Sequence, residues 1–183
     1  NTEKILKPNK PKYVYGILVD SLKVINNTVK EGQTLGEILY FNHIDHQQIA
    51  QAVIKSKGIF DVRGVNAGKD YTLICRDDSL ETLCYFVYQE TAKNYVVFDF
   101  MNEPKVYRGE KEVVTKLKLS TGEINSSLSE SIERQGISPR VSIQLSEIYA
   151  WTIDFFKIQE GDFYKVYYEN NYIDGKYIGI GRI

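Results

Sequence analysis

Residues 149–162 constrain the fold more than any other part of this sequence, because two kinds of periodicity meet there. Ahead of them, apolar residues recur at the spacing of one helix face, whereas residues 163–169 are dominated by Tyr and Phe. Large aromatic rings pack well across the pleated surface of a sheet. The sequence therefore predicts a helix that ends, turns and leads into an aromatic strand, with a second strand at 177–183.

The composition is that of an ordinary globular protein and excludes several classes of partner. The 183 residues suffice for one domain or two small ones, and 43% are apolar. The net charge of −1 shows no excess of basic residues of the kind that binds nucleic acid or anionic lipid. No apolar run approaches the roughly 18 residues of a membrane span. Residues 1–11 are polar, carry Pro8 and Pro11 and lack the apolar core of a signal peptide, so we expect a linker there.

The first segment, residues 12–77, has the order strand, helix, helix, strand. Strands are expected at 13–19 and 22–26 around a tight turn, and again at 71–75. Thr34 with Glu37 three residues later predicts the capped start of one helix. A second helix is expected at 45–57, with Gly58 after its end.

The second segment, residues 78–183, is expected to be an α+β module whose two helices pack against a mostly antiparallel sheet. One helix is expected between Gly122 and Gly136, and the next to begin with Ser138 as N-cap and Pro139 as first residue. Residues 95–100 are nearly continuous in β-formers and predict a central strand. The other strands are expected at residues 83–89, 105–108 and 111–119 and in the two C-terminal segments.

The first segment carries a spaced set of turn and core residues: Val29, Gly32, Thr34, Leu35 and Ile38, followed by Asn66, Gly68, Tyr71 and Leu73. With these residues the segment resembles a LysM domain. Most of these residues have structural roles in such a fold, so the match implies the small βααβ fold more firmly than it implies binding. The resemblance brings two loops close together, where a glycan could form hydrogen bonds, although both could also be ordinary turns. The candidate glycan-binding residues are Gly32, Gln33, Thr34, Asn66 and Gly68.

Three spaced stretches of the second segment occur in a characteristic order: residues 122–128, 136–139 and 149–162. Through them the segment resembles the accessory region that precedes the catalytic domain in bacterial lysostaphin/LytM-type zinc endopeptidases. Together with the LysM-like segment it covers residues 13–183 and is nearest to envelope enzymes of Bacteroides-like bacteria. It implies a region ahead of a catalytic domain that is not contained in these residues.

The zinc-binding motifs of that family are missing from this sequence. The family uses His-x-x-x-Asp and His-x-His, but the two histidines here are His43 and His46, and Gln47 and Ala50 stand four residues after them. We therefore assign no catalytic, cofactor or metal residue, and zinc is expected in the catalytic domain only. We expect His43 and His46 to lie in a polar loop in which Asp45 caps the next helix. Metal binding by the two histidines is the alternative.

The aromatic residues around position 151 allow two interpretations. The cluster could stack on sugars, but core packing of alternate members is the preferred one. Trp151 and Phe156 are candidate inter-domain contacts. Asp154 is expected to form a capping or sheet-edge hydrogen bond. The cluster consists of Trp151, Phe155, Phe156, Phe163, Tyr164, Tyr167 and Tyr168.

The two cysteines, Cys75 and Cys84, each lie among apolar neighbours. A disulfide across a hairpin is compatible with their separation, but free buried thiols are the preferred interpretation.

The resemblance as a whole implies a non-catalytic targeting or regulatory region of a peptidoglycan-cleaving zinc metalloendopeptidase, which positions or occludes the active site. We expect a monomer in the periplasm or cell envelope, with peptidoglycan and the protein's own catalytic domain as partners and no nucleic acid. The alternative is a stand-alone peptidoglycan-binding or scaffold protein without enzymatic activity.

Overall fold

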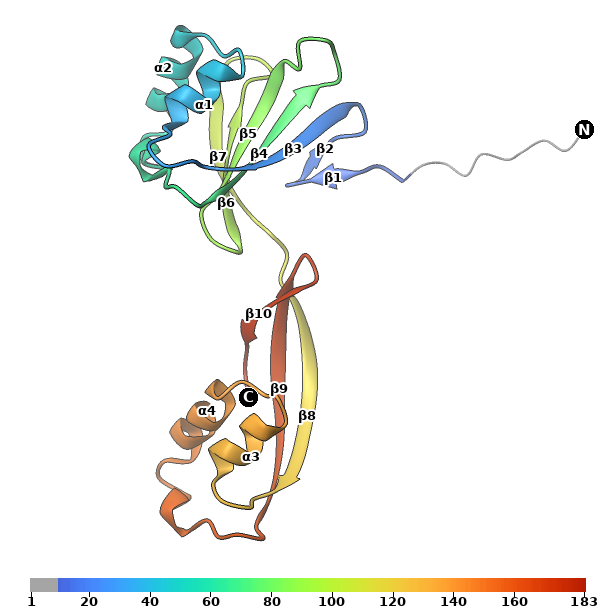
Figure 1. Cartoon of the computed structure of the whole chain (residues 1–183), viewed down its shortest axis with the longest axis vertical. Coiled ribbons are helices and arrows are strands. Elements are labelled where there is room, and N and C mark those ends of the chain that lie inside the picture. Colours follow the sequence, from blue (N-terminus) through green and yellow to red (C-terminus); the bar gives the residue numbers. More distant parts are fainter. Residues whose placement is uncertain (1–9) are drawn as a thin grey trace, which may run out of the picture. The chain divides into compact units, whose positions relative to one another are not determined.

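The computed structural model of the chain describes residues 10–183, so most of the linker expected at 1–11 lies outside the described residues. The chain divides into two compact units, Asn1–Lys111 and Glu112–Ile183 (Figure 1). The described residues contain four α-helices and three sheets of two, five and three strands, all paired antiparallel. The predicted α+β class is confirmed.

The N-terminal unit is built on one five-stranded sheet with the strand order β3-β4-β5-β6-β7. The sequence predicted a division between residues 77 and 78, but β4 and β5 on either side of that point are paired from Tyr71–Tyr88 to Cys75–Leu83. The unit ends instead at Lys111. Its elements are β1 (Tyr13–Val14), β2 (Ile17–Leu18), β3 (Leu22–Thr28), α1 (Leu35–Phe41), α2 (His46–Lys55), the 3₁₀ turn η1 (Val62–Gly64), β4 (Asp70–Arg76), β5 (Leu83–Gln89), β6 (Asn94–Asp99) and β7 (Lys105–Glu110).

Both faces of this sheet are covered, which explains why β5 and β6 are apolar without alternation. The helices α1 and α2 cover one face, and the small hairpin β1–β2 lies on the other (Figure 1). Strand β6 lies between β5 and β7, so it is internal to the sheet as predicted. Residues 13–19 do not form one strand, because Tyr15 (φ 53°) and Gly16 (φ 76°) make a two-residue turn of the kind that closes hairpins.

The helix starts of this unit follow the predicted capping chemistry. The Glu37 N–H donates to the Thr34 hydroxyl oxygen at 3.2 Å, while the Thr34 N–H donates to the Glu37 carboxylate at 2.9 Å. This reciprocal pair is a capping box, as predicted. Asp45 caps α2 by accepting from the Gln48 N–H at 2.8 Å, and Gly58, with φ 80°, follows the helix. Asp45 is therefore a helix cap, as expected.

The C-terminal unit is a three-stranded sheet, in the order β10-β9-β8, with two helices on one face. Its buried core consists of Ile132, Val141, Val166 and Tyr168. The elements are β8 (Val114–Glu123), α3 (Leu128–Arg134), α4 (Arg140–Tyr149), the 3₁₀ turn η2 (Phe155–Lys157), β9 (Phe163–Ile173) and β10 (Lys176–Ile180).

Two helix starts in this unit differ from the prediction. The strand β8 continues through Glu123, which pairs with Phe163, so α3 begins only after its N-cap Ser127. In α4 the N-cap residue is Pro139, without a side-chain capping bond, rather than Ser138. Leu128 and Ile132 are helical, as their spacing predicts, whereas Ile124 lies in the connection between β8 and α3.

Candidate functional site

Two loops of the N-terminal unit lie side by side through backbone hydrogen bonds at Val29. The Val29 N–H donates to the Lys69 carbonyl oxygen at 2.8 Å, and the Gly68 N–H donates to the Val29 oxygen at 2.9 Å. Gly32 and Gly68 have φ values of 75° and 81°, a conformation that side chains disfavour. The structure thus joins the two loops that carry the predicted glycan contacts, residues 32–34 in one and residues 66 and 68 in the other, through Val29.

The side-chain amides of Gln33 and Asn66 each form a hydrogen bond within their own loop. The Gln33 Oε1 accepts from the Lys30 N–H at 3.1 Å, and the Asn66 Nδ2 donates to the Gly64 oxygen at 2.9 Å. Among the described residues, the other ends of these amides, Gln33 Nε2 and Asn66 Oδ1, form no further hydrogen bond. Because residues 66–69 are exposed, the loops present one donor and one acceptor on a fixed backbone.

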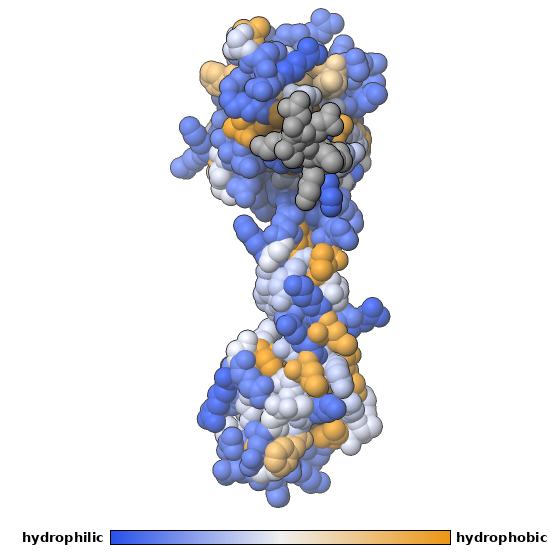
Figure 2. Space-filling view, turned by 90° about the vertical axis from the view of Figure 1, so that its right-hand side faces the viewer, coloured by the Kyte–Doolittle hydropathy of each residue, from blue (hydrophilic) through white to orange (hydrophobic). Residues whose placement is uncertain are grey.

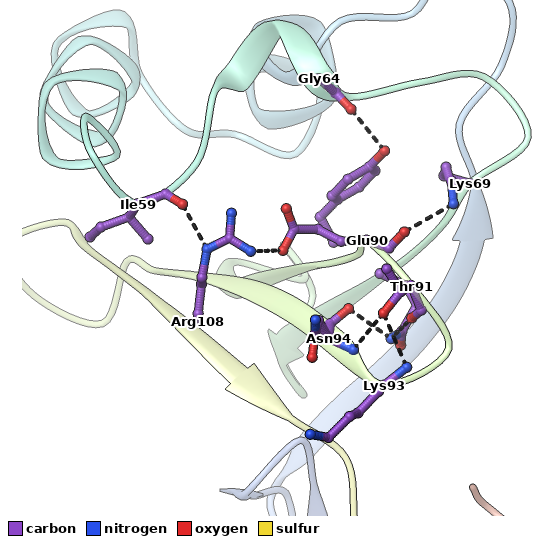
Figure 3. A network of polar contacts seen from close by, with 10 residues as sticks. Ile59, Gly64, Lys69, Glu90, Thr91, Lys93, Asn94 and Arg108 are labelled. Atoms are coloured by element: carbon purple, nitrogen blue, oxygen red, sulfur yellow. Dashed lines mark hydrogen bonds and ion pairs between the residues drawn. The ribbon is translucent and has the colours of Figure 1, made fainter. Parts of the chain in front are cut away.

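A polar network anchors the second loop to the sheet (Figure 3). The buried Tyr88 hydroxyl donates to the Gly64 oxygen at 3.0 Å and accepts from the Asn66 N–H at 3.1 Å. At the edge of the sheet, Arg108 pairs with Glu90 and donates to the Ile59 oxygen at 2.7 Å. The chain between α2 and β4 is therefore held at both ends, which the sequence did not predict because the partners lie 22 to 49 residues apart.

The aromatic cluster of the C-terminal unit divides between core and surface. Tyr164 and Tyr168 face the helices in the core of this unit. In contrast, Trp151 and Phe156 are fully exposed, at 98% and 102%. The alternation predicted for residues 163–168 is therefore present, and Trp151 and Phe156 are not among the members that pack in the core. They lie outside the strand, in the segment around η2, where no element covers them.

Asp154 lies at the start of η2 and has a capping role, as expected. Its carboxylate accepts from the Phe156 N–H at 3.1 Å. Lys157 approaches the same carboxylate at 3.4 Å.

A further apolar surface lies on the sheet of the C-terminal unit, on the side away from the helices. Leu119 stands opposite Tyr167 in the β8–β9 register, and Leu117 opposite Glu169. Leu117 is 68% exposed and Phe163 is 79% exposed. Figure 2 shows hydrophobic side chains (orange) spread over the face of this unit that is turned to the viewer.

The two histidines lie at the start of α2 and in the loop before it. His43 has a left-handed backbone (φ 65°), and the ring of His46 stacks on Tyr40 at 4.8 Å. Within residues 10–183, no group of three or more His, Cys, Asp or Glu side chains could hold a metal ion. No helix in the same range is long and apolar enough to cross a membrane.

Cys75 and Cys84 are free and buried, as preferred from the sequence. Burial raises the pKa of the Cys75 thiol from its ordinary 9.0 to about 11, and the neighbouring Cys84 acts in the same direction. A thiol with such a pKa is a poor nucleophile near neutral pH, and the Cys75 side chain packs in the core between the sheet and the helices.

The sequence is similar to two curated metallopeptidases, while no family model matches it. It is 24% identical over 159 residues to an uncharacterised metalloprotease of Haemophilus influenzae, a match that covers 85% of this chain and 32% of the relative. It is 34% identical over 74 residues to the peptidoglycan DD-endopeptidase ShyC of Vibrio cholerae, covering 40% of this chain and 17% of that protein. The chain therefore spans about a third or less of the length of these relatives.

Solved structures of two bacterial proteins are similar over most of the chain. A zinc-containing peptidase from Vibrio cholerae matches 84% of it with a TM-score of 0.49 and 18% identity, over 47% of that chain. Csd3 from Helicobacter pylori matches 85% of it, also at 0.49, with 16% identity over 42% of that chain. Scores below 0.5 support no conclusion by themselves, so the relationship to metallopeptidases rests on the sequence matches.

Proposed function

We propose that this chain is a non-catalytic targeting or regulatory region of a zinc metalloendopeptidase that cleaves peptidoglycan in the periplasm or cell envelope. The observation that carries the proposal is the unequal coverage of the first relative. That metalloprotease aligns with 85% of this chain but uses only 32% of its own length to do so. Most of the relative, with room for a catalytic domain, therefore lies outside the match.

The zinc of the whole enzyme is assigned to the catalytic domain and not to these residues. His43 and His46 are three residues apart, and neither starts a motif of the family. The ring of His46 is stacked on Tyr40, and the neighbouring Asp45 is used as a helix cap. The donor set of a catalytic zinc site, about three protein ligands and one open position, is not met by this pair.

Targeting is assigned to the two loops around Val29. The strand, helix, helix, strand order from β3 to β4, with β3 and β4 paired, agrees with the LysM-like module predicted within residues 12–77. Gln33 Nε2 and Asn66 Oδ1 would then meet the hydroxyl or acetamido groups of a glycan strand.

Regulation is assigned to the exposed aromatic side chains of the C-terminal unit. Trp151 and Phe156 would contact the enzyme's own catalytic domain and hold this region beside, or over, its active site. Fully exposed rings of this size are characteristic of the centre of an interface.

A pull-down on purified peptidoglycan sacculi tests the targeting role. We expect the chain to be retained, and the exchanges Gln33→Ala and Asn66→Ala to reduce retention. Gln47→Ala, an exposed glutamine on α2, is the matched control and should leave retention unchanged. If none of the three exchanges changes retention, the loops are not the glycan-binding site. Complete absence of retention would leave contact with the catalytic domain as the remaining role.

Hydrolysis by the full-length gene product tests the parent activity. We expect it to release peptides from sacculi only with zinc bound, and to lose activity with a chelator. Absence of zinc-dependent hydrolysis would overturn the assignment and favour the alternative, a stand-alone peptidoglycan-binding or scaffold protein.

A further inference from the structure

A pocket of about 450 Å³ in the C-terminal unit lies between the loop that joins α3 to α4 and the hairpin β9–β10. Tyr168, Asn170 and Tyr172 line it from alternate positions of β9, so they share one face of the strand. Tyr177 stands opposite Tyr172 in the β9–β10 register and belongs to the same face. Residues 136–139 close the other side. This volume lies in the range of small-ligand sites, roughly 300–1,000 Å³.

The lining of the pocket is aromatic and neutral. Its eight lining residues include three tyrosines and no Asp, Glu, Lys or Arg. The rings of Tyr172 and Tyr177 meet edge to face, with centroids 5.9 Å apart. Lys116 lies over the ring of Tyr172, 4.9 Å from its centroid, and so uses one face of that ring. Because no charged side chain lines the pocket, its tyrosine rings favour an uncharged ligand with a flat apolar side over an acidic peptide.

One polar group in the pocket lacks a partner. The Asn170 Oδ1 is buried and accepts no hydrogen bond from the residues that the structure describes. Buried amide groups are nearly always paired, because an unpaired one costs about 1–3 kcal/mol. The terminal torsion of Asn is broad, so half a turn of the amide exchanges its oxygen and nitrogen. Asn170 can therefore present either an acceptor or a donor to a ligand.

We propose that this pocket binds an N-acetylated amino sugar of a glycan strand, as a site separate from the loops of the N-terminal unit. An acetamido group carries one N–H donor, one carbonyl acceptor and a methyl group, which match the Asn170 amide and the tyrosine rings. The pyranose ring supplies a flat C–H face for Tyr177, which is 49% exposed and accessible at the mouth. The choice of an acetylated glycan among neutral ligands rests on the proposed function.

Titration of the full chain with an oligomer of β-1,4-linked N-acetylglucosamine, followed by amide NMR, tests the site. We expect shifts at residues 136–139 and 168–177. Tyr177→Ala should weaken binding about two- to tenfold, the effect of one lost aromatic contact. Tyr167→Ala is the matched control, because Tyr167 is exposed to a similar 51% on the other face of β9. Asn170→Ser should weaken binding of the acetylated oligomer, and cello-oligosaccharide, which lacks the acetamido group, should bind more weakly.

Each contrary outcome is distinguishable. Equal binding of cello-oligosaccharide, or binding unchanged in Tyr177→Ala and Asn170→Ser, overturns the proposed site. Binding abolished only by Gln33→Ala or Asn66→Ala also overturns it, while leaving the proposed targeting function in place. Shifts in the pocket with a sugar-free stem peptide, and none with the oligomer, would assign it to peptide instead.

Discussion

Tyr95 lies across Gly109 in the β6–β7 register, with its ring placed directly over the glycine. A Cβ atom added to Gly109 would lie 2.3 Å from the Cζ of that ring, far inside any real contact. The Tyr95 hydroxyl donates to the Tyr15 oxygen at 3.1 Å, and the two rings meet edge to face at 4.8 Å. The missing side chain of Gly109 thus lets Tyr95 reach the hairpin β1–β2 and fix it on the sheet.

We therefore expect Gly109→Ala to destabilise the N-terminal unit by about 1–3 kcal/mol, as overpacking does elsewhere. Urea unfolding followed by circular dichroism measures this. Gly36→Ala is the matched control, because Gly36 lies in α1 with no heavy atom within 4 Å of an added Cβ. That exchange should stabilise the N-terminal unit by roughly 0.5–1 kcal/mol. An unchanged midpoint for Gly109→Ala would show that Tyr95 can move away without loss.

Tyr88→Phe should cost about 1–3 kcal/mol and loosen the loop that carries Asn66. The exchange removes the hydroxyl that pairs with the Gly64 oxygen and the Asn66 N–H, and Tyr88 is only 2% exposed. Hydrogen exchange of the Asn66 amide should become faster in the variant. Tyr107→Phe is the control, since Tyr107 is 40% exposed and forms no hydroxyl hydrogen bond among the described residues. Unaltered exchange at Asn66 would contradict the anchoring role of Tyr88.

The local signals in the sequence were sufficient where the partner lies within a few residues. The capping box of Thr34 and Glu37 and the cap of Asp45 span three residues each, so spacing alone predicts them. The predicted domain boundary at residue 77 was wrong because it depends on partners that are not local. Pairing of β4 with β5 depends on a sheet that continues past the turn, and no local pattern distinguishes that turn from a linker.

The candidate site shows the same limit. The two loops could be placed together because the LysM resemblance supplies their arrangement, and the bonds at Val29 agree with it. The tyrosine pocket was missed, although the spacing of Tyr168, Asn170 and Tyr172 marks one strand face. Its other wall comes from residues 136–139, which only the tertiary packing brings near. Trp151 lies between α4 and η2, outside any helix or strand, so no periodicity in the sequence distinguishes a core position from a surface one there.

Burial of Cys75 predicts a loss of stability at high pH. Its pKa is about 11 in the folded chain against an ordinary 9.0, so folding favours the protonated thiol. This contribution is fully present below pH 9 and is lost as the pH rises to about 11. Burial also raises the pKa values of Tyr71 and Tyr95, which act in the same direction. The free energy of unfolding should therefore fall across this window, and more steeply in the parent chain than in Cys75→Ala. Identical slopes for the two proteins would show that Cys75 ionises as it does when unfolded.

Trp151, the only tryptophan of the chain, reports on the proposed contact with a catalytic domain. Because its side chain is 98% exposed, this chain alone should emit as indole does in water and be quenched readily by iodide. In the full-length gene product, covering of Trp151 should shift its emission to the blue and protect it from quenching by iodide. The exchange Trp151→Phe identifies the share of the signal that comes from Trp151. Phe156→Ser should weaken that protection, since Phe156 belongs to the same exposed segment. Leu80→Ser, at a side chain exposed by 70% in the N-terminal unit, is the control and should leave it intact. Equal quenching of Trp151 in this chain and in the full-length protein would exclude the contact, and regulation would then have to act through another surface.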